Sequence, residues 1–454
     1  MKVGFVSLGC SKNLIDTEIA IGHFKNNNYE IENNPEKADI IVINTCGFIA
    51  SAKEEAINTI LEMAEYKKKK CKYLIVMGCL VQRYYTDLVK TLPEVDLFIK
   101  IDEYGEMWKK IQDLVEKNKV ERSTTKVVEK VSEIKQLPMP EFNEFYDRVV
   151  TTGKNYAYLK IGEGCSNMCT YCAIPYIRGK FISRKMKEIL DEAEMLAKKG
   201  IKELIVIAQD TTKYGVDIYG EPKLAELLQK LSDINGIKWI RFLYSYPEGI
   251  TDELIEVVKN NEKIAKYFDI PIQHISDKIL KRMNRKTNKQ QITDLITKLR
   301  NEIPDVTLRT SLIVGFPGEK KEDFDDISKE ILTEYEPNAL KSPQPLDVEH
   351  LIEECLFLDM KSERLSYDGK VLGLIAFADT VYTGIGSNDE PFSIEVQEGT
   401  VLLDKSLDDL KHPGRKRFTQ AHEASHWICH RSHHSYDKRR YEFCKREECP
   451  AIAC

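Results

Sequence analysis

The sequence predicts an α/β protein with three successive units. These are an N-terminal doubly wound parallel sheet, a central partial (β/α) barrel and a small α+β C-terminal region. Continuous apolar strands alternate with helices over the first 118 residues, which is typical of a parallel sheet covered on both faces. A second run of strand–helix order follows a polar segment. After residue 326 the pattern changes to short strands and a basic, histidine-rich end.

Composition sets the broad limits. The chain has 454 residues, of which 42% are hydrophobic and 31% charged, as is ordinary for a globular protein of about three domains. The 67 basic and 73 acidic side chains give a net charge of −6, so we do not expect direct nucleic-acid binding through bulk charge. We recognise no secretory leader and no apolar run of about 18 residues. We therefore expect a cytoplasmic monomer without membrane contact, in which clustered cysteines bind metal rather than form disulfides.

Three strands of the first unit, residues 1–118, each end in a cysteine. The strands are KVGFVSL, ADIIVINTC and KYLIVMGC, with helices expected at NLIDTEIAIGHFKNN and AKEEAINTILEMAEYKK. Ligands of parallel sheets bind beyond the carboxyl ends of the strands, where Cys10, Cys46 and Cys79 fall beside glycines that let a bulky group approach. A lone buried cysteine such as Cys71 is interpreted instead as a small hydrophobic side chain.

Residues 119–150 are polar and then carry prolines, which indicates a linker to the second unit, residues 151–326. The strands expected there are YAYLKIGEG, KELIVIAQD, IKWIRFLYSYP, KYFDIPIQH and VTLRTSLIVGFPG. Sites in (β/α) barrels lie at the carboxyl ends of the strands. Polar side chains gather at these ends: Glu163, Gln209, Asp210, Tyr246, Gln273, His274 and Glu319. Taken singly, each could equally be a capping or turn residue.

The first strand of the central unit leads into GCSNMCTYCAIP, residues 164–175, which holds Cys165, Cys169 and Cys172. A closed structural zinc site uses four ligands, and a disulfide framework needs an even count. Three thiolates on a short loop suit a 4Fe–4S cubane with one iron left open. S-adenosylmethionine can chelate that iron, and an electron from the cluster then cleaves its C–S bond to give a carbon radical.

Residues 1–326 resemble the methylthiotransferase branch of the radical S-adenosylmethionine (SAM) enzymes. The resemblance is carried by SLGCSKNLIDTE, INTCGFIASAKEEAI, MGCLVQRY, YAYLKIGEGCSNMCTYCAIPYIRGKFISR, IAQDTTKYGVDIYG, KWIRFLYSYPEGITDELIEV, DIPIQHISDKILKRMNR and LRTSLIVGFPGE. The wording of SKNLIDTE and CGFIASAKEE favours the branch that modifies an aspartate of a ribosomal protein over the branch that modifies tRNA.

The resemblance implies two 4Fe–4S clusters, each held by three cysteines. The radical-generating cluster would be bound by Cys165, Cys169 and Cys172, here called the radical set. A second cluster, which carries the sulfur to be inserted, would be bound by Cys10, Cys46 and Cys79, here called the auxiliary set. One SAM would donate the methyl group and another the deoxyadenosyl radical, which abstracts hydrogen from the β-carbon of an aspartate in a small-subunit ribosomal protein. A flavodoxin or a ferredoxin would supply the electrons.

Further contacts to SAM follow from the same resemblance. They would come from a turn and from the end of the second strand: Gly315, Phe316, Pro317, Gly318 and Glu319, and Gln209 and Asp210. Arg178 and Arg184 would offset the charge of the cluster and of carboxylates. The alternative for both arginines is a solvated surface position.

Residues 327–454 resemble the ImmA/IrrE family of metallopeptidases through RKRFTQAHEASHWICH, a preceding LLD strand and a following EFCKREECPAIAC. The resemblance implies a zincin-like fold. His422 and His426 would face one side of a helix and bind zinc, and Glu423 would activate a metal-bound water. The family's third zinc ligand is not recognisable, so we expect an incomplete site. The alternative is a solvated basic tail.

The methylthiotransferase similarity ends near residue 326. The family continues with a further barrel strand and a small TRAM β-barrel, which are not recognisable here, so we expect a truncated barrel with LRTSLIVG as an exposed apolar edge. Three interpretations stay open at this point. They are a methylthiotransferase, an HExxH zinc metallopeptidase or phage-type regulatory protein, and a non-catalytic fusion of two truncated reading frames.

Overall fold

The computed structural model describes most of the first 323 residues and parts of the remainder. The described residues are 1–117, 145, 147–153, 155–323, 352–353, 358–366, 371–376, 379–386, 389–408, 416, 419–420 and 441–445. The chain divides into two compact units, Met1–Asp323 and Phe324–Cys454. In the described part of the chain, no helix is long and apolar enough to cross a membrane.

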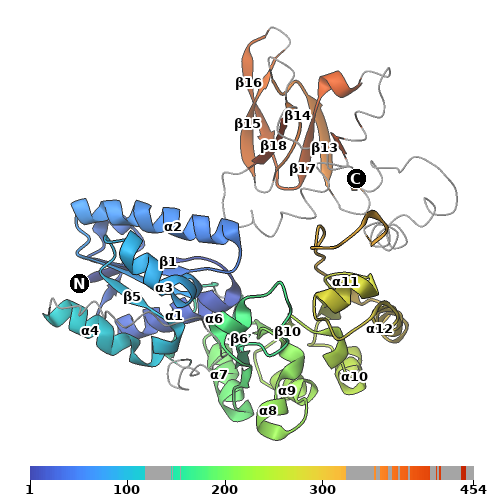
Figure 1. Cartoon of the computed structure of the whole chain (residues 1–454), viewed down its shortest axis with the longest axis horizontal. Helices are drawn as coiled ribbons and strands as arrows, with labels where there is room; N and C mark the ends of the chain where they lie inside the picture. Colours follow the sequence, from blue (N-terminus) through green and yellow to red (C-terminus); the bar gives the residue numbers. More distant parts are fainter. Residues whose placement is uncertain are drawn as a thin grey trace. The chain divides into compact units, whose positions relative to one another are not determined.

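A five-stranded parallel sheet opens the first unit (Figure 1). Its order is β2-β1-β3-β4-β5, with β1 (Lys2–Ser7), β2 (Glu30–Ile31), β3 (Ile40–Thr45), β4 (Tyr73–Gly78) and β5 (Leu97–Ile99). The helices are α1 (Ser11–Asn26), α2 (Ala50–Ala64), α3 (Cys79–Thr91) and α4 (Met107–Lys117). The predicted doubly wound sheet is confirmed. The sequence did not reveal β2 and β5, which are too short for a recognisable apolar pattern.

Alternating side chains of the central strands build a core on each face of the sheet. Ile41 and Ile43 of β3 pack in a cluster with residues of α2 and α3, whereas Ile40 and Val42 pack with residues of α1 and α4. Figure 1 shows α2 on one side of the sheet and α1 and α4 on the other. Since successive side chains of a strand point to opposite faces, a strand buried on both faces reads as a continuous apolar run.

The second half of this unit repeats the strand–helix order. A parallel sheet has the order β10-β9-β6, from β6 (Tyr156–Lys160), β9 (Glu203–Ile207) and β10 (Trp239–Phe242), and β11 (Tyr267–Asp269) pairs in parallel with β12 (Thr307–Arg309). The longer helices are α7 (Met186–Lys198), α9 (Leu224–Ser232), α10 (Asp252–Asn260) and α12 (Lys289–Glu302). These elements confirm the predicted partial (β/α) barrel.

Short elements complete the barrel around the cysteine loop. They are the antiparallel pair β7 (Gly162–Glu163) and β8 (Ile182–Ser183), with α6 (Ile174–Arg178), α8 (Val216–Tyr219) and α11 (Asp277–Arg282). The apolar edge expected at LRTSLIVG corresponds to β12 and the residues after it. Within the described residues β12 pairs only with β11, and Val314 is 57% exposed.

The second unit contains a four-stranded sheet and a hairpin. The sheet order is β13-β17-β14-β18, with β13 (Asp359–Glu363), β14 (Val371–Ala376), β17 (Thr400–Asp404) and β18 (Tyr441–Lys445), and the hairpin joins β15 (Thr380–Ile385) to β16 (Pro391–Val396). The short strands expected here are therefore present. His422, Glu423 and His426 lie outside the described residues, so the zincin-like fold and its zinc site stay predictions.

Candidate functional site

The auxiliary set lies at the carboxyl ends of three neighbouring strands. Cys10 precedes α1 after β1, Cys46 follows β3 and Cys79 opens α3 after β4. A Cβ atom on Gly9 would stand 2.8 Å from Cys46 Cβ, so only glycine permits the close approach of these two strand ends. Cys79 is buried, Cys46 is partly buried and Cys10 is exposed. The topology thus brings the three thiols to one edge of the sheet, as the sequence predicts.

The donor set of these thiols fits an iron–sulfur cluster. Burial raises the pKa of Cys46, and it raises the pKa of Cys79 to about 12, so iron must displace protons from both thiols. In a cubane cluster each thiolate binds a different iron, so three thiols at one edge of the sheet can hold three of its four irons.

The radical set lies on the loop between β7 and α6. Cys165 and Cys169 are buried and Cys172 is partly buried; burial raises the pKa of Cys172 and raises that of Cys165 to about 12. Cys169 Sγ lies 3.6 Å from Tyr246 Oη and 3.9 Å from Arg285 Nη1. The Arg285 guanidinium in turn lies 4.3 Å from the centroid of the Tyr246 ring. A cation and a hydroxyl thus lie beside this sulfur.

The backbone of this loop needs a glycine and is tied to a neighbouring turn. Gly164 has φ +76°, and a Cβ atom there would lie 2.3 Å from the carbonyl oxygen of Lys180. Further along, the Thr170 N–H donates to the carbonyl of Met283 at 3.1 Å. The loop is therefore held in one conformation by sterics at its start and by a hydrogen bond at its middle.

The turn at residues 315–319 reaches the same loop through one arginine. The Phe316 N–H donates to Glu319 Oε2 at 2.8 Å, which closes the turn. A Cβ atom on Gly318 would lie 2.6 Å from Arg282 Cζ, and the Arg282 carbonyl accepts a hydrogen bond of 3.0 Å from the Thr170 hydroxyl. Arg282 thus contacts the predicted cofactor-facing turn with its side chain and the loop of the radical set with its backbone.

Gln209 and Asp210 follow β9 and also contact this region. Asp210 accepts from Asn167 of the cysteine loop at 2.7 Å and from the Thr212 hydroxyl at 2.6 Å, so it is both a cap and a loop support. Burial raises the pKa of Asp210. Gln209 Nε2 donates to Glu163 Oε1 at 2.7 Å, while its Oε1 is buried and has no hydrogen-bond partner in the described residues. An unpartnered acceptor beside the radical set fits a bound group with an N–H or O–H donor, as SAM has.

A buried set of polar and charged side chains, here called the inner network, lies beside the auxiliary set. It consists of Asn13, Asp16, Lys160, Glu163 and Arg178. Arg178 donates to Asn13 Oδ1 at 2.6 Å, to Asp16 at 2.9 Å and to Glu163 at 3.1 Å. Lys160 lies 2.6 Å from Asp16 and 2.8 Å from Glu163. Two cations therefore compensate two carboxylates, as burial of charge requires.

The inner network connects the auxiliary set with the barrel. Asn13 Oδ1 also accepts from Cys79 Sγ at 3.5 Å. Burial alone would raise the pKa of Glu163, but Arg178 and Lys160 outweigh it and hold the pKa well below its usual range. The alternative of a solvated surface position is wrong for Arg178 and for Arg184, since each is only 2% exposed.

A second buried set of charges, the outer network, joins α1 to α7. It consists of Glu18, Arg148, Glu192 and Arg184. Arg148 lies 3.0 Å from Glu18 and 3.0 Å from Glu192, and Arg184 lies 2.6 Å from Glu192. Arg148 belongs to the segment predicted as a linker, yet it is fully buried. The described end of that segment is therefore packed between the sheet and the barrel.

The sequence analysis missed Lys12, Asn13, Asp16 and Lys160 as parts of the site. Two signals were available. Polar residues recur along the first turns of an otherwise apolar helix, and Lys160 ends an apolar strand that should be buried. A charge in such a position needs a partner of opposite charge, and the need for this partner indicates a contact with another domain.

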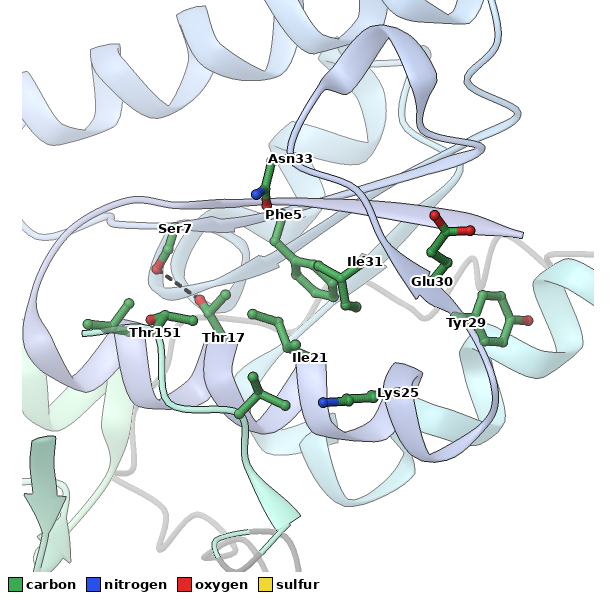
Figure 2. A pocket seen from close by; sticks show the side chains of 12 residues that line it. Phe5, Ser7, Thr17, Ile21, Lys25, Tyr29, Glu30, Ile31, Asn33 and Thr151 are labelled. Atoms are coloured by element: carbon green, nitrogen blue, oxygen red, sulfur yellow. Dashed lines mark hydrogen bonds between the residues drawn. The ribbon is translucent and has the colours of Figure 1, made fainter. Parts of the chain in front are cut away.

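A pocket with a volume of about 620 Å³ lies between β1, α1, β2 and residues 149–151 (Figure 2). Phe5, Ile21 and Tyr29 contribute to its lining, and the Ser7 and Thr17 hydroxyls there lie 2.9 Å apart. None of the residues that line it is a cysteine. The pocket therefore offers no thiolate to a cluster, and the candidate site is the carboxyl edge of the sheet, which carries the thiols.

Comparison with known proteins shows the family of the chain. Residues 2–100 match the family described as Uncharacterized protein family UPF0004, and residues 159–331 match the Radical SAM superfamily. The ribosomal protein uS12 methylthiotransferase RimO of Alkaliphilus oremlandii is 61% identical over 327 residues, which are 72% of this chain and 70% of that protein. RimO of Acetivibrio thermocellus is 54% identical over 323 residues, which are 71% of this chain and 70% of that protein.

A solved structure shares the fold. The radical SAM methyltransferase TsrM from Kitasatospora setae, with tryptophan and a SAM analogue bound, superposes with a TM-score of 0.54 at 12% identity and covers 94% of this chain and 90% of that one. At this identity the likeness shows the fold alone. The sequence identity to the RimO proteins shows more, because it extends over more than two thirds of both chains. The chain therefore belongs to the RimO family of radical SAM methylthiotransferases and is an enzyme of this type.

Proposed function

We propose that this enzyme inserts a methylthio group at the β-carbon of an aspartate in ribosomal protein uS12 of the small subunit. The observation that carries the proposal is the presence of two separate sets of three thiols, with the inner network in contact with Cys79 of the auxiliary set. Each set leaves one iron of a 4Fe–4S cluster without a protein thiolate. The names of the RimO relatives supply the substrate.

In this proposal each cysteine set holds one 4Fe–4S cluster. When bound, the clusters and SAM supply the electron, the radical, the sulfur and the methyl group, with a flavodoxin or ferredoxin as electron source. The residues around the clusters and SAM orient these groups and shield them from water. Arg285 and Tyr246 face Cys169 of the radical set, Gln209 Oε1 offers an acceptor for SAM, and burial of the inner network keeps water away.

The proposal also assigns the parts of the chain. Residues 1–118 form the domain of the auxiliary set, 119–150 the connection, 151–326 the radical SAM domain and 327–454 a separate C-terminal region. The first and third parts supply all the residues of the two cysteine sets and of the inner network.

The test is the iron and sulfide content of the full chain after anaerobic purification and reconstitution. We expect about eight irons per chain. Changing all three cysteines of either set to alanine should leave about four. Cys71→Ala is the matched control, because Cys71 is a buried thiol outside both sets whose Sγ lies 3.4 Å from the Tyr73 carbonyl.

A second measurement tests the substrate. The reconstituted enzyme is incubated with purified uS12, SAM and a reductant, and the aspartate peptide is examined by mass spectrometry for the gain of one CH₂S unit. About eight irons that survive removal of the auxiliary set, or only about four irons in the wild type, would reject the two-cluster assignment. Eight irons with no mass gain on uS12 would reject the substrate.

A further inference from the structure

Lys12 is a buried cation without a carboxylate partner. It lies in the first turn of α1, two residues from Cys10, and is 7% exposed. Its Nζ lies 3.2 Å from the centroid of the Tyr244 ring, and among the described residues no carboxylate lies within ion-pair distance of it. By contrast, every cation of the inner and outer networks contacts at least one carboxylate. Lys12 differs in this respect from the lysine and arginines of the inner and outer networks.

The position of Lys12 relates it to both cysteine sets. Tyr244 follows β10, and Tyr246, two residues further, contacts Cys169 of the radical set. Lys12 therefore lies between Cys10 and the strand end that touches the radical set. Tyr244 has φ +64°, a conformation that aromatic residues rarely adopt, and its N–H donates to Asp269 Oδ2 at 3.0 Å. Such strained backbone is retained where the surroundings hold it, often at functional sites.

A buried ammonium is costly unless an anion or other partner compensates it. The Tyr244 ring provides part of that compensation through a cation–π contact. An anionic ligand would provide the rest. In an aspartate side chain the carboxylate is one bond from the β-carbon, so a substrate whose β-carbon meets sulfur at the auxiliary set brings its carboxylate close to Cys10. We propose that Lys12 binds the carboxylate of the substrate aspartate and makes the enzyme select aspartate over asparagine.

This inference rests on the proposed function, and the test separates the two. The probe is a uS12 peptide that spans the target aspartate, together with its Asp→Asn version. Dissociation constants are measured by fluorescence anisotropy with the reconstituted full chain. A charge-assisted hydrogen bond predicts that the wild type binds the aspartate peptide about tenfold to a hundredfold more tightly than the asparagine peptide.

Substitutions at Lys12 then locate the selectivity. Lys12→Gln should bring the two dissociation constants within about twofold of each other, whereas Lys12→Arg should keep most of the preference. Lys69→Gln is the matched control, because Lys69 also lies near a tyrosine ring, 5.6 Å from the Tyr66 centroid, but is exposed and paired with Glu36. It removes the same charge and should keep the wild-type preference.

Each outcome decides the matter. If the wild type binds neither peptide, the proposed function fails. If the wild type binds both peptides equally, or if Lys12→Gln keeps the preference for aspartate, the function stands and the inference about Lys12 is wrong. If Lys12→Gln loses the iron of the auxiliary set and keeps the preference for aspartate in its residual binding, Lys12 serves the cluster, and the inference is overturned as well.

Discussion

Replacement of Arg148 by methionine should destabilise the enzyme by breaking the outer network. Arg148 is fully buried, and its guanidinium lies 3.0 Å from both Glu18 and Glu192. Removing one partner of a buried ion pair typically costs about 3–5 kcal/mol, because a charge is left uncompensated. Glu18 keeps two donors from Thr151, at 2.7 and 2.9 Å, and Glu192 keeps Arg184. We therefore expect the free energy of unfolding to fall by about 3 kcal/mol, the lower end of this range.

The assay is urea unfolding of the cluster-free full chain, with hydrogen exchange of α1 as a local readout. Arg148→Met should lower the unfolding midpoint and accelerate exchange in α1, whose Glu18 loses its cation. Lys187→Met is the control, since Lys187 pairs with Asp191 at 2.9 Å but its side chain is 87% exposed. Exposed pairs contribute about 0–1 kcal/mol, so this variant should unfold almost as the wild type does.

A double variant sharpens the argument. Glu18→Gln in the Arg148→Met background removes the uncompensated carboxylate and should restore part of the lost stability. The reasoning is refuted if Arg148→Met unfolds within about 0.5 kcal/mol of the wild type, well below the cost of an unpaired buried charge. The reasoning is also refuted if Glu18→Gln, added to Arg148→Met, lowers the free energy of unfolding by as much again as Arg148→Met alone.

Three further results are expected. Gly164→Ala forces a Cβ atom to within 2.3 Å of the Lys180 carbonyl oxygen, so it should lower the thermal midpoint and reduce iron from about eight to about four per chain. Arg285→Met removes a cation beside the radical set and should make the potential of its cluster more negative in an EPR-monitored redox titration; an unchanged potential would contradict this. Burial raises the pKa of Cys79 and Cys165 to about 12, so their thiolate fraction at pH 8 is on the order of 10⁻⁴. Alkylation of these two thiols in the metal-free chain, followed by mass spectrometry, should therefore be far slower than alkylation of a free thiol. Fast modification of both thiols at pH 8 would contradict this expectation.

The sequence predicts well those features that local pattern determines. The apolar runs of β1, β3, β4, β6 and β9 reveal the parallel strands, and their order along the chain predicts α/β layers. Cysteines at three strand ends predict the auxiliary set because carboxyl ends of adjacent parallel strands must meet at one edge. The loop spacing of the other three predicts the radical set.

The sequence predicts poorly those features that depend on distant partners. Arg178 reads locally like a surface residue, yet Asp16, 162 positions away, pairs with it inside the molecule. On α1, Asp16 and Glu18 interrupt the apolar pattern of a helix that is buried on both sides. One side contacts the sheet and the other contacts charges of the barrel, a contact that no local periodicity encodes.

The charged contacts of α1 have a consequence for domain exchange between relatives. A chimera that takes its first 118 residues from one methylthiotransferase and its barrel from another would separate Glu18 from Arg148 and Glu192, and Asp16 from Lys160 and Arg178. Each such graft would succeed only if both donors carry matching charges at these positions. The two halves of the enzyme are therefore expected to change in step at this contact, while the outer helices α2 and α4 remain free to diverge.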